Sequence, residues 1–178
     1  MLEGKNVNLR VMEKEDLPLL VEWFNNPQIT GEFEPLDPQR SKKEFEDRYE
    51  KLGPDEKFFL IEKKDANRIG SIGHYHTGSM LEIGYSILPD ERGKGYCTEA
   101  VKIMVDYLFL SRPIVRVQAH TNARNMASQR VLEKSGFKKE GTLRKEYFVR
   151  GEWVDSCVYG ILREEWREPK ILTKVYRD

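Results

Sequence analysis

The sequence predicts an α/β fold, in which a mixed, mostly antiparallel sheet holds one central parallel pair of strands and is flanked by helices. Several short segments alternate apolar and polar residues, as half-buried strands do. One glycine-containing loop separates a strand from an amphipathic helix that leads into another strand, and such a unit makes its two strands parallel. The length of 178 residues fits one domain, 1–178, better than two small ones.

The first half of the chain is predicted to form strands and helices in alternation. Val7–Met12 alternates apolar and polar residues, and Asp16–Phe24 carries apolar residues on one helical face. Ser41 should begin a second helix, because Glu44 three residues later completes a capping box, and Gly53 lies where that helix would end. Three strands follow, with turns at Asp65–Asn67 and Thr77–Ser79: Lys57–Lys63, Arg68–His76 and Leu81–Leu88.

The second half contains the strand–helix–strand unit. The loop Asp90–Cys97 leads into a helix over Thr98–Leu110, and the strand Ile114–Thr121 follows. This strand should lie parallel to Leu81–Leu88. A further helix and two strands are predicted after it: Asn125–Ser135, capped by Gly136, then Glu146–Val149 and Trp153–Leu162, which turn at Arg150–Glu152. The charged tail, residues 163–178, receives no assignment.

Composition and charge exclude several classes of protein. The chain has 30 Lys and Arg against 30 Asp and Glu, so it lacks the positive excess with which a nucleic-acid binder neutralises phosphates. The start, Met1–Lys5, lacks the apolar stretch of a signal peptide, and the longest apolar runs are too short to cross a membrane. There are two cysteines, Cys97 and Cys157, and no Cys/His cluster with zinc-site spacing. The sequence therefore predicts a cytoplasmic protein without a metal site.

The loop from Arg92 to Thr98, Arg-Gly-Lys-Gly-Tyr-Cys-Thr, leads directly into a helix. Its two glycines let the backbone bend so that successive N–H groups point into one concavity. The first turn of the helix adds unpaired N–H groups and the positive end of its dipole. A diphosphate fits such a site. A surface turn is the alternative for the loop alone, whose spacing matches neither a Walker loop nor a Rossmann fingerprint.

Three segments resemble the GNAT superfamily of N-acetyltransferases. Pro89–Ala100 resembles its acetyl-CoA diphosphate motif, Arg/Gln-x-x-Gly-x-Gly/Ala, and Asn122–Phe137 resembles a second motif that ends in Glu-Lys-x-Gly-Phe. Gly151–Asp155 is similar to a Gly-x-x-x-Asp hairpin of the branch that includes ribosomal-protein N-terminal and spermidine acetyltransferases. Cys97 departs from the first motif but is small. The defined positions of that motif are Arg92, Gly95 and Cys97.

The resemblance implies a GNAT-like fold and an enzyme that moves the acetyl group of acetyl-CoA, its cosubstrate, to a primary amine. In this superfamily the two parallel strands splay apart, and the pantetheine arm pairs with the exposed strand edge. Carried onto this chain, Ile87 and Leu88 would contact the acetyl and pantetheine groups, and Asn125 the pantetheine. The amine attacks the thioester directly, so neither cysteine is needed as a nucleophile. The diphosphate would be held by Arg92, Gly93, Lys94, Gly95, Tyr96, Cys97 and Thr98.

The resemblance also suggests catalytic residues. Many relatives place a tyrosine on the last helix to protonate the departing thiolate, but that position is Leu132 here. Ser128, one helical turn earlier, matches a serine of the ribosomal-protein branch and is the candidate acid, with a purely local role as the alternative. Glu82, on the strand beside the cosubstrate, is the candidate base, with a solvent-facing role as the alternative. Three residues are weaker candidates for the base: His74, Tyr85 and Tyr147.

The identity of the amine that accepts the acetyl group is the part of the function that the sequence defines least. Deprotonation at pH 7 costs about 1.4 kcal/mol for an α-amino group and about 4.6 kcal/mol for a lysine-like amine. A peptide or protein N-terminal α-amine is the expected acceptor. A small polyamine or amino-sugar is an alternative, because residues 31–56 hold nine acids against five bases and would attract a cation, although an exposed helix face explains the same acids. A CoA-binding module without activity is another alternative. Relatives in this branch are often dimers, so a homodimer stays open.

Overall fold

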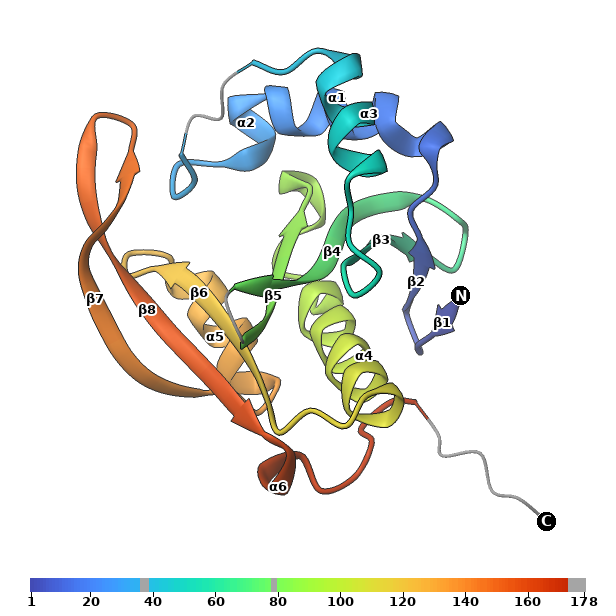
Figure 1. Ribbon diagram of the computed structural model, residues 1–178, viewed down its shortest axis with the longest axis vertical. Coiled ribbons are helices and arrows are strands. Elements are labelled where there is room, and N and C mark those ends of the chain that lie inside the picture. Colours follow the sequence, from blue (N-terminus) through green and yellow to red (C-terminus); the bar gives the residue numbers. More distant parts are fainter. Residues whose placement is uncertain (36–38, 78–79, 173–178) are drawn as a thin grey trace.

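The computed structural model describes residues 1–35, 39–77 and 80–172. These residues form an eight-stranded sheet in the order β1-β2-β3-β4-β5-β6-β8-β7 (Figure 1). Neighbouring strands are antiparallel except β5 and β6, which are parallel, so the predicted fold class is confirmed. The strands are β1 (Leu2–Glu3), β2 (Val7–Val11), β3 (Lys57–Lys63), β4 (Arg68–Thr77), β5 (Met80–Ile87), β6 (Arg116–Asn122), β7 (Lys138–Val149) and β8 (Glu152–Leu162).

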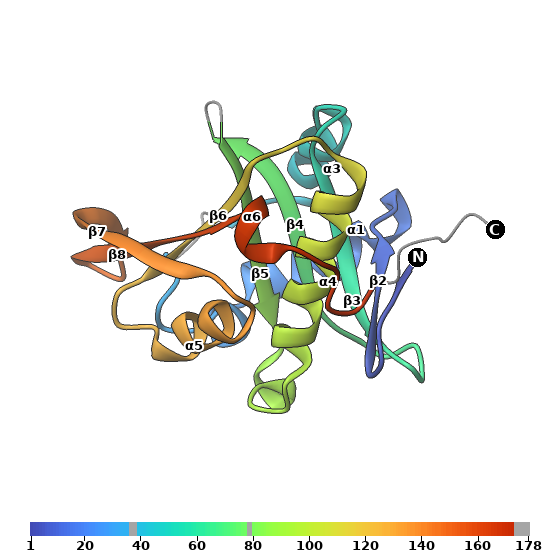
Figure 2. The same cartoon turned by 90° about the horizontal axis from the view of Figure 1, so that it is seen from below.

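Helices cover both faces of this sheet (Figures 1 and 2). They are η1 (Lys14–Asp16), α1 (Leu17–Asn25), α2 (Pro27–Thr30), α3 (Lys42–Glu50), η2 (Pro89–Glu91), α4 (Tyr96–Ser111), α5 (Met126–Lys134) and α6 (Arg163–Trp166). Phe59 and Ile61 of β3 belong to the core beneath α4, whereas Leu60 between them belongs to the core beneath α1. The alternation of the strands thus separates two apolar cores, one on each face.

The helix α4 has the apolar face that the sequence predicts. Val101, Met104, Val105 and Leu108 are all at most 2% exposed, and they pack against the central strands. This burial holds α4 firmly across the sheet, so the N-terminus of the helix has a fixed position beside the end of β5.

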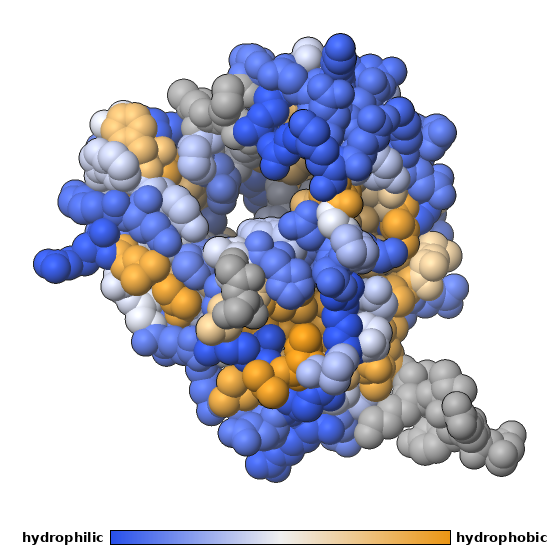
Figure 3. All heavy atoms as spheres, viewed as in Figure 1, coloured by the Kyte–Doolittle hydropathy of each residue, from blue (hydrophilic) through white to orange (hydrophobic). Residues whose placement is uncertain are grey.

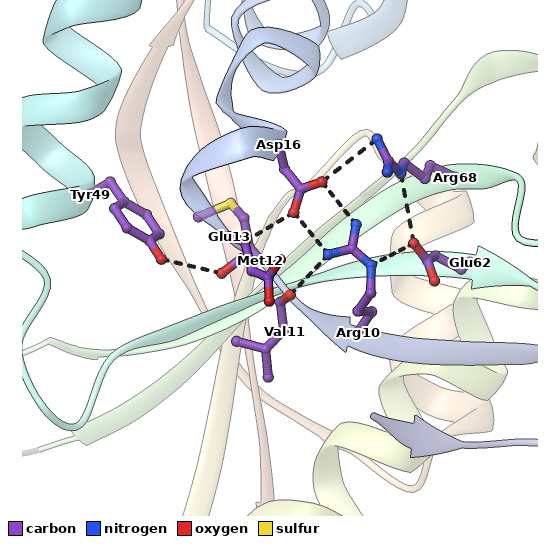
Figure 4. A network of polar contacts seen from close by, with 8 residues as sticks. All are labelled: Arg10, Val11, Met12, Glu13, Asp16, Tyr49, Glu62 and Arg68. Atoms are coloured by element: carbon purple, nitrogen blue, oxygen red, sulfur yellow. Dashed lines mark hydrogen bonds and ion pairs between the residues drawn. The ribbon is translucent and has the colours of Figure 1, made fainter.

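A network of charged side chains joins the start of α1 to the sheet (Figure 4). Arg10 of β2 donates to Asp16 and to Glu62, both at 2.8 Å, and Arg68 lies within 3.7 Å of both carboxylates. Burial alone would raise the pKa of Asp16. The hydrogen bonds from Arg10 and the Glu13 backbone, with the charges of Arg10 and Arg68, together outweigh burial, and the pKa is lowered. The carboxylate therefore stays charged and anchors η1 and α1 against β2 and β3.

The tail that the sequence left unassigned begins with residues 163–172, named here the C-terminal strap. The strap leaves the end of β8 and crosses α4 (Figure 2). The side chain of Asp106 on α4 is fully buried and accepts four hydrogen-bond donors from the strap. The donors are Trp166 Nε1 (2.8 Å) and the backbone N–H groups of Lys170 (2.9 Å), Ile171 (2.6 Å) and Leu172 (3.0 Å).

Two elements differ from the prediction. The predicted strand Glu146–Val149 is too short, because β7 already begins at Lys138. β7 is an edge strand with most of its residues exposed, and its register shifts near Lys145, which has a φ of 55°. Such a strand has no apolar alternation to detect. A short helix that the sequence did not predict, α2, also begins at Pro27, two residues after the end of α1. The predicted turn Thr77–Ser79 falls partly outside the described residues.

Candidate active site

The sheet splits between its two parallel strands. β5 and β6 pair at a single described position, Glu82 with Gln118. Beyond it β5 stays with β4 as far as Ile87, whereas β6 stays with β8 as far as Asn122. The β5 edge beyond Glu82 therefore keeps backbone N–H and C=O groups with which an extended chain can pair.

The loop after β5 presents unpaired amides. Gly93 and Gly95 have φ values of 77° and 86°, which residues with a side chain rarely adopt. The backbone N–H groups from Gly95 to Thr98 donate to no described residue, and they lie at the positive end of the 16-residue helix α4. A Cβ added at either glycine would meet no atom within 4 Å. Free amides, a helix dipole and open space together fit a diphosphate.

The charged side chains of this loop have partners within the protein. Lys94 pairs with Glu91 at 2.9 Å, and Lys63 pairs with the same carboxylate at 3.2 Å. These two hydrogen bonds lower the pKa of Glu91. Arg92 Nε donates to the carbonyl of Ile87, so its guanidinium is held by backbone. The backbone amides, more than these side chains, are therefore presented to a ligand.

The remaining predicted cosubstrate residues surround the split. The side chain of Ile87 is buried in the core under α4, and Leu88 packs against the core under α1. Three of their backbone groups already have partners: the Ile87 carbonyl accepts from Arg92, the Leu88 N–H donates to Ile69 O, and the Leu88 carbonyl accepts from Glu91. Tyr96 and Cys97 lie in the first turn of α4. Burial raises the pKa of the Cys97 thiol to about 12, which keeps it protonated and makes it a poor nucleophile. Both cysteines are free thiols.

Ser128 and Asn125 lie together at the start of α5. The side chain of Asn125 caps the helix by accepting from the N–H of Ser128 at 3.0 Å. The hydroxyl oxygens of Ser128, the candidate acid, and Tyr85 of β5 are 2.9 Å apart. A tyrosine from the sheet therefore lies against the candidate acid on α5. Burial raises the pKa of Tyr85, which keeps its hydroxyl protonated at neutral pH. Leu132, the usual tyrosine position, is fully buried in the core.

Glu82 is a buried carboxylate at the point where the strands part. It is 7% exposed, so the alternative of a solvent-facing role is excluded. Its oxygens accept from Tyr75 Oη (3.1 Å), Thr77 Oγ1 (3.2 Å) and Gln118 Nε2 (3.2 Å), and no cation among the described residues pairs with it. A buried carboxylate with only neutral donors is suited to accept a proton or a cation.

Sequence reasoning missed Tyr75 and Gln118. Tyr75 lies directly opposite Glu82 in the β4–β5 hairpin, and Gln118 lies opposite it in the parallel pair. Pairing the ends of the two expected strands, His76 with Leu81, would have placed Tyr75 there. The position of Gln118 follows only from where the two parallel strands meet.

Tyr147 and Glu34 complete the same region. Burial raises the pKa of Tyr147 to about 12, with further contributions from the negative charges of Glu146, Glu82 and Glu34. The charges of Glu82 and Glu34 also help to raise the pKa of Tyr75. Two carboxylates and two tyrosines thus lie within electrostatic reach of one another. The space-filling view shows the surface hollowed here, between the α1–α3 helices and the β7–β8 hairpin (Figure 3).

His74, a weaker candidate for the base, lies elsewhere. Its neighbour Tyr75 faces Glu82, so the alternation of β4 turns His74 to the opposite face, where it packs near Tyr107 of α4 and is fully buried. Burial, with the charge of Arg112, lowers its pKa to about 4. The structure therefore separates His74 from the other candidates.

Most acids of residues 31–56 have partners away from the hollow. Glu44 closes the capping box with Ser41, as predicted. Glu50 pairs with Lys14, and Asp55 pairs with Arg112. Asp37 lies outside the described residues. These acids therefore give little support to a continuous acidic rim, and Glu34 is the member of the set whose charge reaches the tyrosines.

A split sheet beside an amide-lined loop defines an enzyme that binds an extended diphosphate-containing cosubstrate. The family described as "Acetyltransferase (GNAT) domain" matches residues 6–138. The chain belongs to this family and is an acetyl-CoA-dependent N-acetyltransferase.

Named relatives span nearly the whole chain. A probable N-acetyltransferase, YjcK of Bacillus subtilis (strain 168), is 33% identical over 93% of this chain and 98% of its own length. The spermidine N(1)-acetyltransferase of Vibrio cholerae serotype O1 is 29% identical over 92% of this chain and 96% of its own length.

Solved structures of N-acetyltransferases have a fold similar to that of this chain. The spermidine N-acetyltransferase from Vibrio cholerae in complex with CoA and spermine has a TM-score of 0.82 at 25% identity, and the match covers 92% of this chain and 99% of that one. A dodecameric form of the Vibrio cholerae enzyme has a TM-score of 0.78 at 26% identity, covering 90% of this chain and 96% of that one. In the described part of this chain, no helix has the length and apolarity needed to cross a membrane.

Proposed function

We propose that this enzyme acetylates a primary amine of a small polycation of the polyamine class. The observation that carries the proposal is Glu82, a buried carboxylate with only neutral partners where β5 and β6 part. Support comes from relatives named as spermidine acetyltransferases and from a similar solved structure that holds CoA and spermine. The N-terminal α-amine of a peptide, favoured from the sequence alone, is the competing acceptor.

The cosubstrate site rests on backbone groups. The free amides from Gly95 to Thr98 would hold the diphosphate of acetyl-CoA, and the unpaired edge of β5 would pair with its pantetheine arm. Acetyl-CoA supplies the thioester carbonyl carbon that the amine attacks. The Asn125 side chain, already bound to Ser128 through its oxygen, keeps its amide N–H groups for the arm.

The chemistry needs a proton acceptor and a proton donor. A C–N bond forms as the neutral amine attacks, and the C–S bond breaks as CoA thiolate leaves. The ammonium proton that must be lost before attack passes to Glu82 and then to solvent. Ser128, whose hydroxyl lies against that of Tyr85, gives its proton to the thiolate. The second nitrogen proton, lost as the amide forms, replaces the proton on Ser128, so CoA leaves as the thiol and the serine hydroxyl is restored. No covalent enzyme intermediate is involved.

The region around Glu82 suits a polycation more than a peptide terminus. Glu34 and Glu82 provide two negative charges within reach of Tyr75 and Tyr147. A second ammonium group would interact with these charges and with the tyrosine ring faces. The single cationic group of a peptide α-amine would interact with only one of these two carboxylates.

The test is a panel of amines incubated with acetyl-CoA, with release of the CoA thiol as the measurement. The panel contains spermidine, spermine, glucosamine and short peptides with free N-termini. We expect kcat/KM for spermidine to exceed that for each peptide by about tenfold or more, or 1.4 kcal/mol of transition-state stabilisation. A preference for peptides would overturn the polyamine assignment. Binding of acetyl-CoA without thiol release from any amine would indicate a binding module.

A further inference from the structure

The α2 segment, residues 27–33, forms one wall beside the hollow and is weakly held by its own packing. α2 has four residues, none of them fully buried, and only Ile29 packs partly against the core under α1. One helical turn is not stable by itself. Its position must therefore be fixed by contacts from outside the segment.

Side chains from three distant elements provide those contacts through backbone carbonyls. Arg92 Nη2, from the cosubstrate loop, donates to Ile29 O at 2.7 Å. Arg150 Nη2, from the β7–β8 turn, donates to the carbonyls of Pro27 and Gly31, both at 3.0 Å. At the end of β6, Asn122 Nδ2 donates to Phe33 O at 3.1 Å. Pro27 O also accepts from the N–H of Gly31. The carbonyls of Ile29, Gly31 and Phe33 accept from no backbone N–H among the described residues, so the side-chain donors satisfy groups that a short helix leaves unpaired.

Arg92 differs from the other two donors because it also belongs to the cosubstrate loop. Its Nε is fixed to Ile87 O at 3.0 Å at the end of β5. The guanidinium lies over Gly31, where an added Cβ would be 3.5 Å from Nη1. One planar group thus joins the end of β5, the start of the amide loop and the α2 segment.

We propose that Arg92 is a positioning residue that couples occupation of the cosubstrate loop to the order of the α2 segment. A ligand that fixes the amides after Gly93 also fixes the Arg92 backbone, and the guanidinium transmits that restraint to Ile29. The inference rests on the proposed function only for the identity of the amine. Because coupling between two sites is reciprocal, an amine that contacts the α2 segment should also tighten CoA binding.

Hydrogen exchange of the amides of residues 28–33, with and without coenzyme A, tests the coupling without any acceptor. In the unmodified protein, coenzyme A should slow their exchange several-fold. In Arg92→Met this slowing should disappear even when coenzyme A is supplied at a concentration that saturates the variant. Arg150→Met is the matched control: the segment should exchange faster in both states, and coenzyme A should still slow it.

Arg92→Lys separates this role from a phosphate contact. Lysine keeps the charge but cannot bridge Ile29 and Ile87 with a planar fork, so the coupling should also be lost in Arg92→Lys at saturating coenzyme A. Slowed exchange of residues 28–33 that persists in Arg92→Met or in Arg92→Lys at saturating coenzyme A would overturn the proposal. Thermal melts verify that the variants fold. With spermidine as acceptor, Arg92→Met should raise KM more than it lowers kcat. If spermidine is not acetylated, the proposed function fails, whereas the exchange result still decides the coupling.

Discussion

At the scale of single residues, Glu82 carries the proposed chemistry. Glu82→Gln keeps the shape and two of the hydrogen-bond positions but removes the proton acceptor. We expect kcat to fall about 100-fold, because a general base typically contributes that much or more. The measurement is thiol release under saturating acetyl-CoA, with the affinity for coenzyme A as the control. A variant that keeps full kcat would exclude Glu82 as the base.

The hydroxyl pair of Ser128 and Tyr85 makes a second residue-level prediction. If Ser128 protonates the thiolate and Tyr85 orients it, Ser128→Ala and Tyr85→Phe should each lower kcat about tenfold, and the double variant should lose little more. Steady-state kinetics of the three proteins check this. Independent, multiplicative losses would show that the two hydroxyls do not act as a unit, and an unchanged Ser128→Ala would favour the local role.

At the scale of elements, the amide loop can be tested through its second glycine. Gly95→Val places a side chain in the open space before the free amides, so the dissociation constant of coenzyme A should rise about 100-fold, or 2.7 kcal/mol. Gly151→Val is the matched control, because Gly151 also has a positive φ, 91°, and open surroundings but lies in the β7–β8 turn. Gly151→Val should lose about as much stability in a thermal melt as Gly95→Val does, and it should keep its affinity for coenzyme A. Equal affinities in both variants would contradict a diphosphate site at this loop.

The elements that sequence predicts well are those with a strong local pattern. The capping box of Ser41 and the apolar face of α4 can be recognised from the residues of each helix alone. β7 has no such pattern, because an exposed edge strand is specified by its pairing with β8. The C-terminal strap is likewise specified by Asp106, 60 or more residues away in sequence. Contacts of this kind cannot be found from local periodicity.

In the candidate site too, some residues could be found from local sequence patterns and others depend on contacts distant in sequence. The loop residues and Glu82 could be proposed from motifs and strand position. Tyr75 and Gln118, in contrast, reach Glu82 only through sheet register. The attachment of Arg92 to Ile29 joins residues 63 positions apart and has no local sequence pattern.

At the scale of the whole molecule, His74 should make stability depend on pH. Its folded pKa, about 4, lies below the unfolded value of 6.5, so the unfolded chain binds the proton more strongly. His74 therefore leaves the free energy of unfolding unchanged above pH 6.5. As the pH drops from 6.5 towards 4, it lowers that free energy by up to about 3 kcal/mol. Urea unfolding between pH 4.5 and 7.5 measures this.

His74→Leu should flatten that dependence, whereas His76→Leu, at an exposed position of the same strand, should retain it. Asp16 also has a lowered pKa, and the stability from its pairing with Arg10 is lost only as the pH falls through that lowered value. The two contributions therefore separate by pH. An equally steep dependence in His74→Leu would show that carboxylates, not this imidazole, control it.

The burial of Asp106 bears on how the protein is made. During synthesis α4 emerges long before residues 166–172, so Asp106 lacks these donors until the strap has been made. A charge that is buried without partners is strongly unfavourable, and here the covering segment itself brings the hydrogen bonds that offset the burial. The strap therefore completes a helix laid down some sixty positions earlier.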